Sequence, residues 1–191
     1  MRPPGFDESA WRRHSWLGLL IAASAALSLV FTCITPFAAF AVIGATSLSR
    51  WNAVRLTVVL WLANQAVGFG VLHYPWTART VAWGVAIGGS AVVGTLAAQW
   101  AVARLGAFRP WVQALGAFVP TFALYQLTLY AVAVSILGGA GAFVPEIVGR
   151  VFVVNALTLA CLHGLNQLVA AAGYSALRGR SEVSPARFVS R

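Results

Sequence analysis

The sequence predicts an all-α polytopic membrane protein, built as a bundle of six transmembrane helices. The 191-residue chain is 60% hydrophobic and only 9% charged, and its mean hydropathy is +0.80. Soluble domains are about 25% charged, so water is not the main solvent of this chain. Apolar runs also recur along the chain, and their lengths approach the roughly 20 residues that a helix needs to cross the hydrocarbon core.

The apolar runs and the turns between them give the expected domain organisation. A cytoplasmic N-terminal segment covers residues 1–15, a transmembrane domain covers 16–174, and a basic cytoplasmic tail covers 175–191. The expected spans are 17–34, 35–52, 56–74, 81–102, 112–137 and 151–174. The second span has the shortest apolar run. Thr35-Pro36 predicts its start, because threonine caps helices and proline suits the first helical position.

The arginines decide the number of spans and their orientation. All thirteen basic residues are arginine, and short cytoplasmic loops carry the excess of basic residues. If the short second run crosses, eleven arginines lie inside and only Arg79 and Arg150 lie outside; if it does not, five lie inside and eight outside. Six spans with both termini inside are therefore favoured. The lack of lysine and the abundance of alanine and valine indicate a GC-rich bacterial genome, so the expected location is the bacterial inner (cytoplasmic) membrane.

The charge pattern and the missing motifs exclude several classes of function. The arginines lie in short clusters between apolar runs, which does not fit a nucleic-acid-binding surface. Cys33 and Cys161 are isolated, and the sequence has no P-loop, H-E-x-x-H or G-x-S-x-G motif. We therefore expect no catalytic residues, no metal site, no cofactor and no enzymatic activity.

Polar side chains inside the spans are the candidates for a ligand site, because such groups face the bundle or a cavity. The span directions place several of them toward the outer side, together with an acid in the glycine-rich outer loop. The predicted ligand-binding residues are Asn64, His73, Trp76, Gln126, Tyr130, Glu146 and Asn155. Gln65 points about 100° away from Asn64 on a helix and is expected to join helices. In the alternative interpretation, each amide only bonds a neighbouring helix, at about 0.6 kcal/mol.

The first half of the chain also resembles a transporter family. AASAALS in the first span, followed by TPFAAFAVIGATSLSRWNAVRLTVVLWLANQAVGFG, with six helices and both ends inside, resembles the S components of energy-coupling-factor transporters. The resemblance implies a small-molecule ligand near the outer side. It also implies docking through Ala22 and Ala26 onto an energising transmembrane subunit that works with ATPases. The N-terminal metal-binding motif of the nickel and cobalt branch is absent from this sequence.

The sequence thus predicts a substrate-binding and uptake protein in the lipid bilayer for a small cofactor precursor or vitamin. Partner subunits would supply the energy, because the chain has no ATPase motif. The alternative is a non-transport membrane protein, either a structural subunit or an assembly factor, whose polar residues serve only to join helices.

Overall fold

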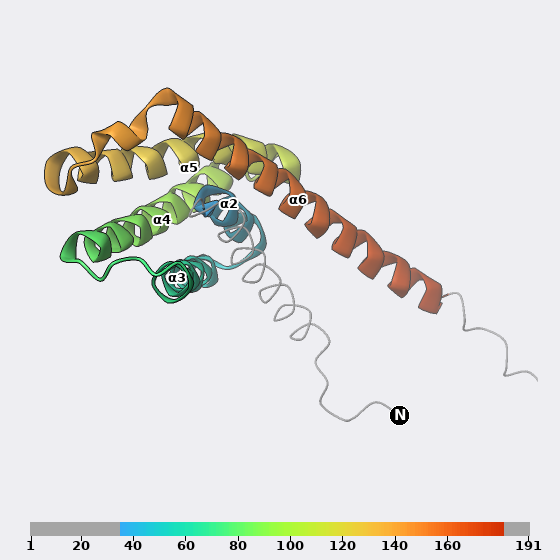
Figure 1. Cartoon of the computed structure of the whole chain (residues 1–191). Helices are drawn as coiled ribbons and strands as arrows, with labels where there is room; N and C mark the ends of the chain where they lie inside the picture. The colour runs from blue at the N-terminus through green and yellow to red at the C-terminus, as the bar shows by residue number, and fades with distance from the viewer. Residues whose placement is uncertain (1–34, 182–191) are drawn as a thin grey trace, which may run out of the picture.

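The structure, a computed structural model, describes residues 35–181, with side chains up to Leu165 and that of Gln167. Its helices are α2 (Phe37–Ser47), α3 (Arg50–Ala66), α4 (Ala78–Arg104), α5 (Pro110–Val132) and α6 (Pro145–Ser181) (Figure 1). Short π-helical segments, η1 (Val67–Val71) and η2 (Ala133–Leu137), extend α3 and α5, and a 3₁₀ turn, η3 (Ala140–Phe143), precedes α6. The expected span 17–34, with Ala22 and Ala26, and the segments 1–15 and 182–191 lie outside the described residues.

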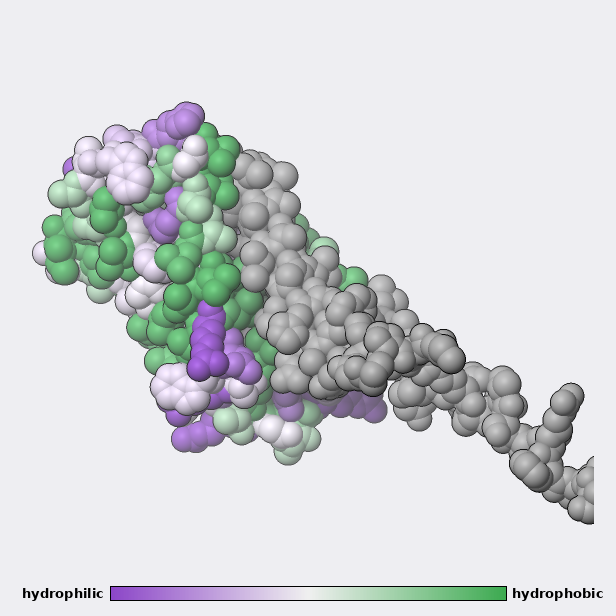
Figure 2. Space-filling model, turned by 90° about the horizontal axis from the view of Figure 1, so that it is seen from below, coloured by the Kyte–Doolittle hydropathy of each residue, from purple (hydrophilic) through white to green (hydrophobic). Residues whose placement is uncertain are grey.

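Four of the helical stretches are long and apolar enough to cross a membrane, which indicates a membrane protein. They are Arg50–Val71, Ala78–Arg104, Pro110–Leu137 and Pro145–Leu165. The all-helical class is confirmed for residues 35–181, where no strand occurs. Much of the visible surface in Figure 2 is hydrophobic, and hydrophilic residues gather mainly toward its upper and lower ends. Leu127 and Leu157, both 62% exposed, are typical of side chains that contact lipid.

The long helices begin and end at other residues than the hydropathy pattern predicts. Helix α3 begins at Arg50 instead of residue 56, and α6 begins at Pro145 instead of residue 151. Proline suits the first turn of a helix, and Glu146 complements the positive end of the helix dipole there. The glycine-rich loop expected on the outer side is thereby shortened, and Glu146 belongs to a helix instead of a loop.

The expected continuous helix over 35–52 is not formed. Helix α2 has 11 residues and is about 16 Å long, because each residue adds 1.5 Å; alone it is too short for a hydrocarbon core of about 30 Å. The chain becomes extended at Leu48 and Ser49 and then turns back. Across this turn Gly44 packs against Ala53, and a Cβ added at Gly44 would lie 3.4 Å from the Cβ of Ala53, at ordinary contact distance.

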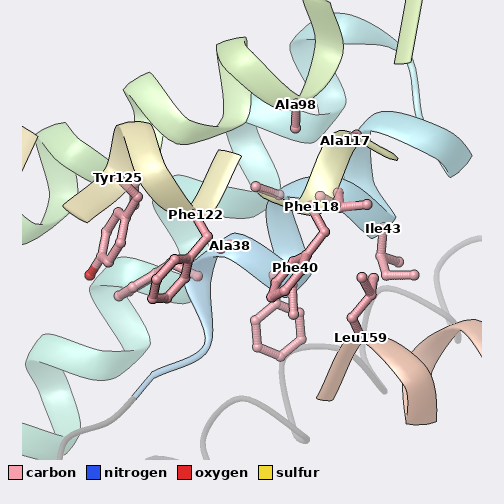
Figure 3. Close-up of a cluster of buried hydrophobic side chains, with 14 of the residues drawn as sticks. Ala38, Phe40, Ile43, Ala98, Ala117, Phe118, Phe122, Tyr125 and Leu159 are labelled. Carbon is pink, nitrogen blue, oxygen red and sulfur yellow. The ribbon is translucent and has the colours of Figure 1, made fainter. Parts of the chain in front are cut away.

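Helix α2 forms the centre of the described bundle and packs against α3, α4, α5 and α6 (Figure 1). Every residue from Phe37 to Gly44 is buried, as expected for a helix that is apolar on all sides. Figure 3 shows Phe40 and Ile43 of α2 among side chains from the surrounding helices, including Phe118 and Leu159. Helix α2, which corresponds to the short second span expected from the sequence, is thus the core of the described part of the chain.

The long helices place the arginines at two distant ends of the bundle. Helix α4 has 27 residues, so its ends lie about 40 Å apart. At its C-terminal end, the Gln99 side chain donates a hydrogen bond to the Arg50 carbonyl, which brings in the start of α3. We call this the arginine-rich end; it carries Arg50, Arg55, Arg104 and Arg109. At the other end of α4, Arg79 and Trp83 lie against Gly138 and Gly139, just beyond η2.

Candidate functional site

A small cavity lies between α3 with η1 and the first half of α4, toward the end opposite the arginine-rich end. Its volume is about 120 Å³. We call it the α3–α4 cavity. Its lining consists of Asn64, Gln65, Val67, Gly68, Phe69, Leu72, Tyr74, Thr80, Trp83, Gly84 and Ile87.

The end of α3 builds one wall of the cavity by folding back on itself. His73 adopts a left-handed backbone conformation with φ of 52°, which reverses the chain after η1. The Tyr74 N–H then donates to the Gly68 carbonyl at 3.0 Å. The Tyr74 ring fills the place of the missing side chain, since a Cβ added at Gly68 would lie 2.9 Å from the ring. Glycine at position 68 is therefore required for this wall.

Aromatic side chains cover the end of the same wall. Phe69, which lines the cavity, stacks on Trp76 with 4.3 Å between ring centroids. Tyr74 meets Phe69 edge to face at 6.3 Å. Trp76 itself is 78% exposed, so only one face of this cover is packed against protein.

Glycines on α4 let α3 approach closely and form the opposite wall. The Trp61 indole N–H donates to the Gly84 carbonyl at 2.8 Å. A Cβ at Gly84 would lie 2.5 Å from Gln65 Oε1, and one at Gly88 would lie 2.6 Å from the Trp61 ring. The small residues at positions 84 and 88 thus receive two large side chains of α3, as expected for helices packed through glycine.

The polar lining offers hydrogen-bonding groups to a ligand. Within the described residues, Asn64 Oδ1 accepts a hydrogen bond from the Thr35 hydroxyl at 2.6 Å. The Gln65 carboxamide makes no hydrogen bond to the described part of the chain. Thr80 shares a hydrogen bond with Thr77, the N-cap residue of α4. The cavity lining therefore includes two amide residues, a tyrosine and a threonine, and its other residues are apolar or aromatic.

The predicted ligand residues are dispersed by the fold. Asn64 lines the α3–α4 cavity, Trp76 covers it through Phe69, and His73 forms the turn beside it. The other four do not line this cavity. Gln126 is half-buried on α5, and the exposed Tyr130 packs edge to face on Phe143 at 5.3 Å. Glu146 is exposed in the first turn of α6.

Asn155 has a structural role at the start of α2. Its side chain is 1% exposed, and Oδ1 accepts a hydrogen bond from the Ala39 N–H at 3.2 Å. Its Nδ2 donates to the Val151 carbonyl in its own helix at 2.9 Å. The N-cap residue of helix α2 is Pro36 instead of the expected Thr35, and the Thr35 hydroxyl donates to Asn64 Oδ1. An amide from α6 instead satisfies one of the free N–H groups at this end.

Some of the cavity residues were not identified from the sequence. Gln65 lines the cavity although its helical position predicted a joining role, and Thr80 and Trp83 of α4 also belong to the wall. The polar and aromatic residues between the two helices, in the stretch HYPWT, would have been the available signal. Among the described residues, no three His, Cys, Asp or Glu side chains come together as a possible metal site.

Comparisons with known proteins add no relative from which a role could be transferred. No protein-family model, curated protein or solved structure matches this chain.

Proposed function

We propose that this chain is a membrane-embedded binding protein that holds a small polar solute in the α3–α4 cavity and acts in its uptake. The observation that carries the proposal is the Gln65 carboxamide, which lies at the cavity wall against Gly84 without a hydrogen bond to the described residues. Gln65 is half-buried, and an amide that has no partner among the described residues retains its donor and acceptor for a ligand or an ordered water in the cavity.

The size of the cavity limits what it holds in this conformation. At about 30 Å³ per water molecule, 120 Å³ corresponds to about four waters. Sites for drug-sized ligands measure about 300–1,000 Å³. A cofactor precursor or vitamin, as in S components, therefore requires the cover to open. Trp76 is the side chain best placed to swing away, since one face of it is packed on Phe69 and the rest is exposed.

In this proposal the energy for uptake comes from other proteins. The chain would work as an S-component-like subunit beside an energising transmembrane subunit and ATPases, since it carries no nucleotide-binding motif. This part rests on the resemblance described above and on the four apolar helices.

A thermal-shift screen of the purified protein tests the proposal. Compounds from water-soluble vitamins and small amides to sugars are added, because a ligand at one hundred times its Kd stabilises by about 2.7 kcal/mol. The Gln65→Leu variant keeps the side-chain size and removes the amide, and we expect it to weaken binding of a stabilising compound about fivefold, the effect of one hydrogen bond. Gln126→Leu is the matched control, since this half-buried glutamine lies outside the cavity.

A structural or assembly role is the second candidate, and a specific observation favours it. Several polar groups of the described helices bond another helix, as in the Thr57–Thr95 hydroxyl pair at 2.7 Å and the Trp61 bond to Gly84. If no compound shifts the melting temperature and Gln65→Leu lowers the stability of the protein alone, the binding proposal is refuted and the structural role is preferred.

A further inference from the structure

A second, larger cavity opens at the arginine-rich end, between the turn that joins α2 to α3 and the last turns of α4. Its volume is about 460 Å³. Arg50 lines one side, and Gln99 and Trp100 line the other. The bond from Gln99 Nε2 to the Arg50 carbonyl, 2.9 Å long, holds the two sides together. We call this the α2–α4 cavity.

Positive charge gathers around this cavity, and no acidic side chain of the described residues lies near it. The Arg104 guanidinium lies over the Trp100 ring, 4.9 Å from its centroid, so a second arginine stands beside the cavity wall. Between residues 35 and 181 the sequence has one acid, Glu146, and it belongs to the first turn of α6, which follows the loop packed on the opposite end of α4. Within this part of the chain, no carboxylate neutralises Arg50 or Arg104.

The remaining walls are apolar and lie beside surface suited to lipid. Ala45, Leu48 and Leu96 are among the apolar lining residues, and we call these three the apolar floor. Trp51 and Trp100 are 70% and 60% exposed, as expected for tryptophans at the level of the lipid headgroups. The cavity thus combines cationic groups, amphipathic rings and an apolar floor at the end of a transmembrane helix.

We propose that the α2–α4 cavity is a binding site for an anionic phospholipid. The phosphate lies between Arg50 and Arg104, and one acyl chain descends along Leu96. Basic pockets between transmembrane helices bind anionic headgroups, and guanidinium groups bind phosphate through paired hydrogen bonds. The apolar floor distinguishes a lipid from a free phosphate, which gains nothing from Leu48 or Leu96. The inference is independent of the proposed function, since it concerns a different cavity at the other end of the bundle.

Native mass spectrometry of the full chain in detergent tests the site. The protein is offered equal amounts of phosphatidylglycerol and phosphatidylcholine with the same acyl chains, and the bound fractions are compared. We expect a clear preference for phosphatidylglycerol, which Arg50→Gln and Arg104→Gln each reduce about fivefold, since one arginine near a lipid surface has an effect of that order. Arg79→Gln is the matched control at the opposite end, and we expect it to leave the preference unchanged.

A second variant separates a lipid site from a site for a free anion. Leu96→Trp fills the apolar floor and leaves both arginines in place, so we expect it to lower phosphatidylglycerol binding as well. Competition by inorganic phosphate or glycerol 3-phosphate, together with full binding by Leu96→Trp, would show a free-anion site and overturn the proposal. Equal binding of the two lipids, or an equal loss in Arg79→Gln, would also overturn it.

The acids of the N-terminal segment provide a competing explanation that the same measurement resolves. Asp7 and Glu8 are candidates to neutralise the arginines in the full chain. In that case the unmodified protein shows no lipid preference, and the double variant Asp7→Asn, Glu8→Gln acquires one, which contradicts lipid as the natural occupant. Circular dichroism and gel filtration check that every variant is folded.

Discussion

Replacing Asn155 by leucine tests whether this amide holds the central helix in place. The substitution keeps a side chain of similar size, so little cavity is created, but it removes the acceptor of the Ala39 N–H. An average hydrogen bond between membrane helices is worth about 0.6 kcal/mol, an N-cap about 0.5–2 kcal/mol, and a buried donor left without a partner costs about 1–3 kcal/mol. Asn155 is 1% and Ala39 0% exposed, so neither water nor a lipid headgroup replaces the bond. We therefore expect a loss of about 2 kcal/mol.

The assay is reversible unfolding in mixed detergent micelles, titrated with a denaturing detergent and followed by tryptophan fluorescence. Thr158→Val is the control, because among the described residues the Thr158 hydroxyl bonds only the Val154 carbonyl of its own helix, and we expect a change below about 0.5 kcal/mol. A loss for Asn155→Leu no larger than that of Thr158→Val would refute the capping role. If Asn155 contacts a ligand instead, the stability of the free protein is unchanged and a ligand-induced shift disappears.

Two further substitutions test the packing in the same unfolding assay. A Cβ at Gly88 would lie 2.6 Å from the Trp61 ring, whereas one at Gly89 meets no atom within 4 Å; we expect Gly88→Ala to destabilise by about 1–3 kcal/mol and Gly89→Ala to be neutral or stabilising by up to about 1 kcal/mol. Equal effects at the two glycines would contradict close packing of α3 on α4. Phe40 is 1% exposed at the centre of the bundle, so we expect Phe40→Ala to lower the free energy of unfolding by about 3–5 kcal/mol. Leu127→Ala, at an exposed position, should lower it much less. A small loss at Phe40 would show that α2 is not the core.

Hydropathy predicted the class of the protein and most of its helices, because the cost of exposing the backbone to lipid leaves helices as the simplest solution. The expected spans 81–102 and 112–137 lie within α4 and within Pro110–Leu137. Helix ends were harder to predict, since turns between apolar segments depend on contacts such as that of Gly44 with Ala53.

The candidate site was only partly predictable for a similar reason. Helical periodicity places Asn64 and Gln65 on different faces, yet both line the α3–α4 cavity. The glycine at position 84 explains this result, because its missing side chain makes room for the Gln65 carboxamide. Periodicity along one helix contains no information about the space that a neighbouring helix leaves open.

Composition and the length of apolar runs determined that this chain is helical and suited to a membrane, because both follow from the free energy of transferring residues into hydrocarbon. The sequence also marked Asn64 as a candidate ligand residue, and Asn64 does line the α3–α4 cavity. Only the tertiary structure decided that α2 lies in the centre, that Asn155 caps it, and which polar groups of residues 35–165 face one another. These features depend on contacts between residues as far as 116 positions apart in the chain, and local sequence patterns carry no record of such pairings.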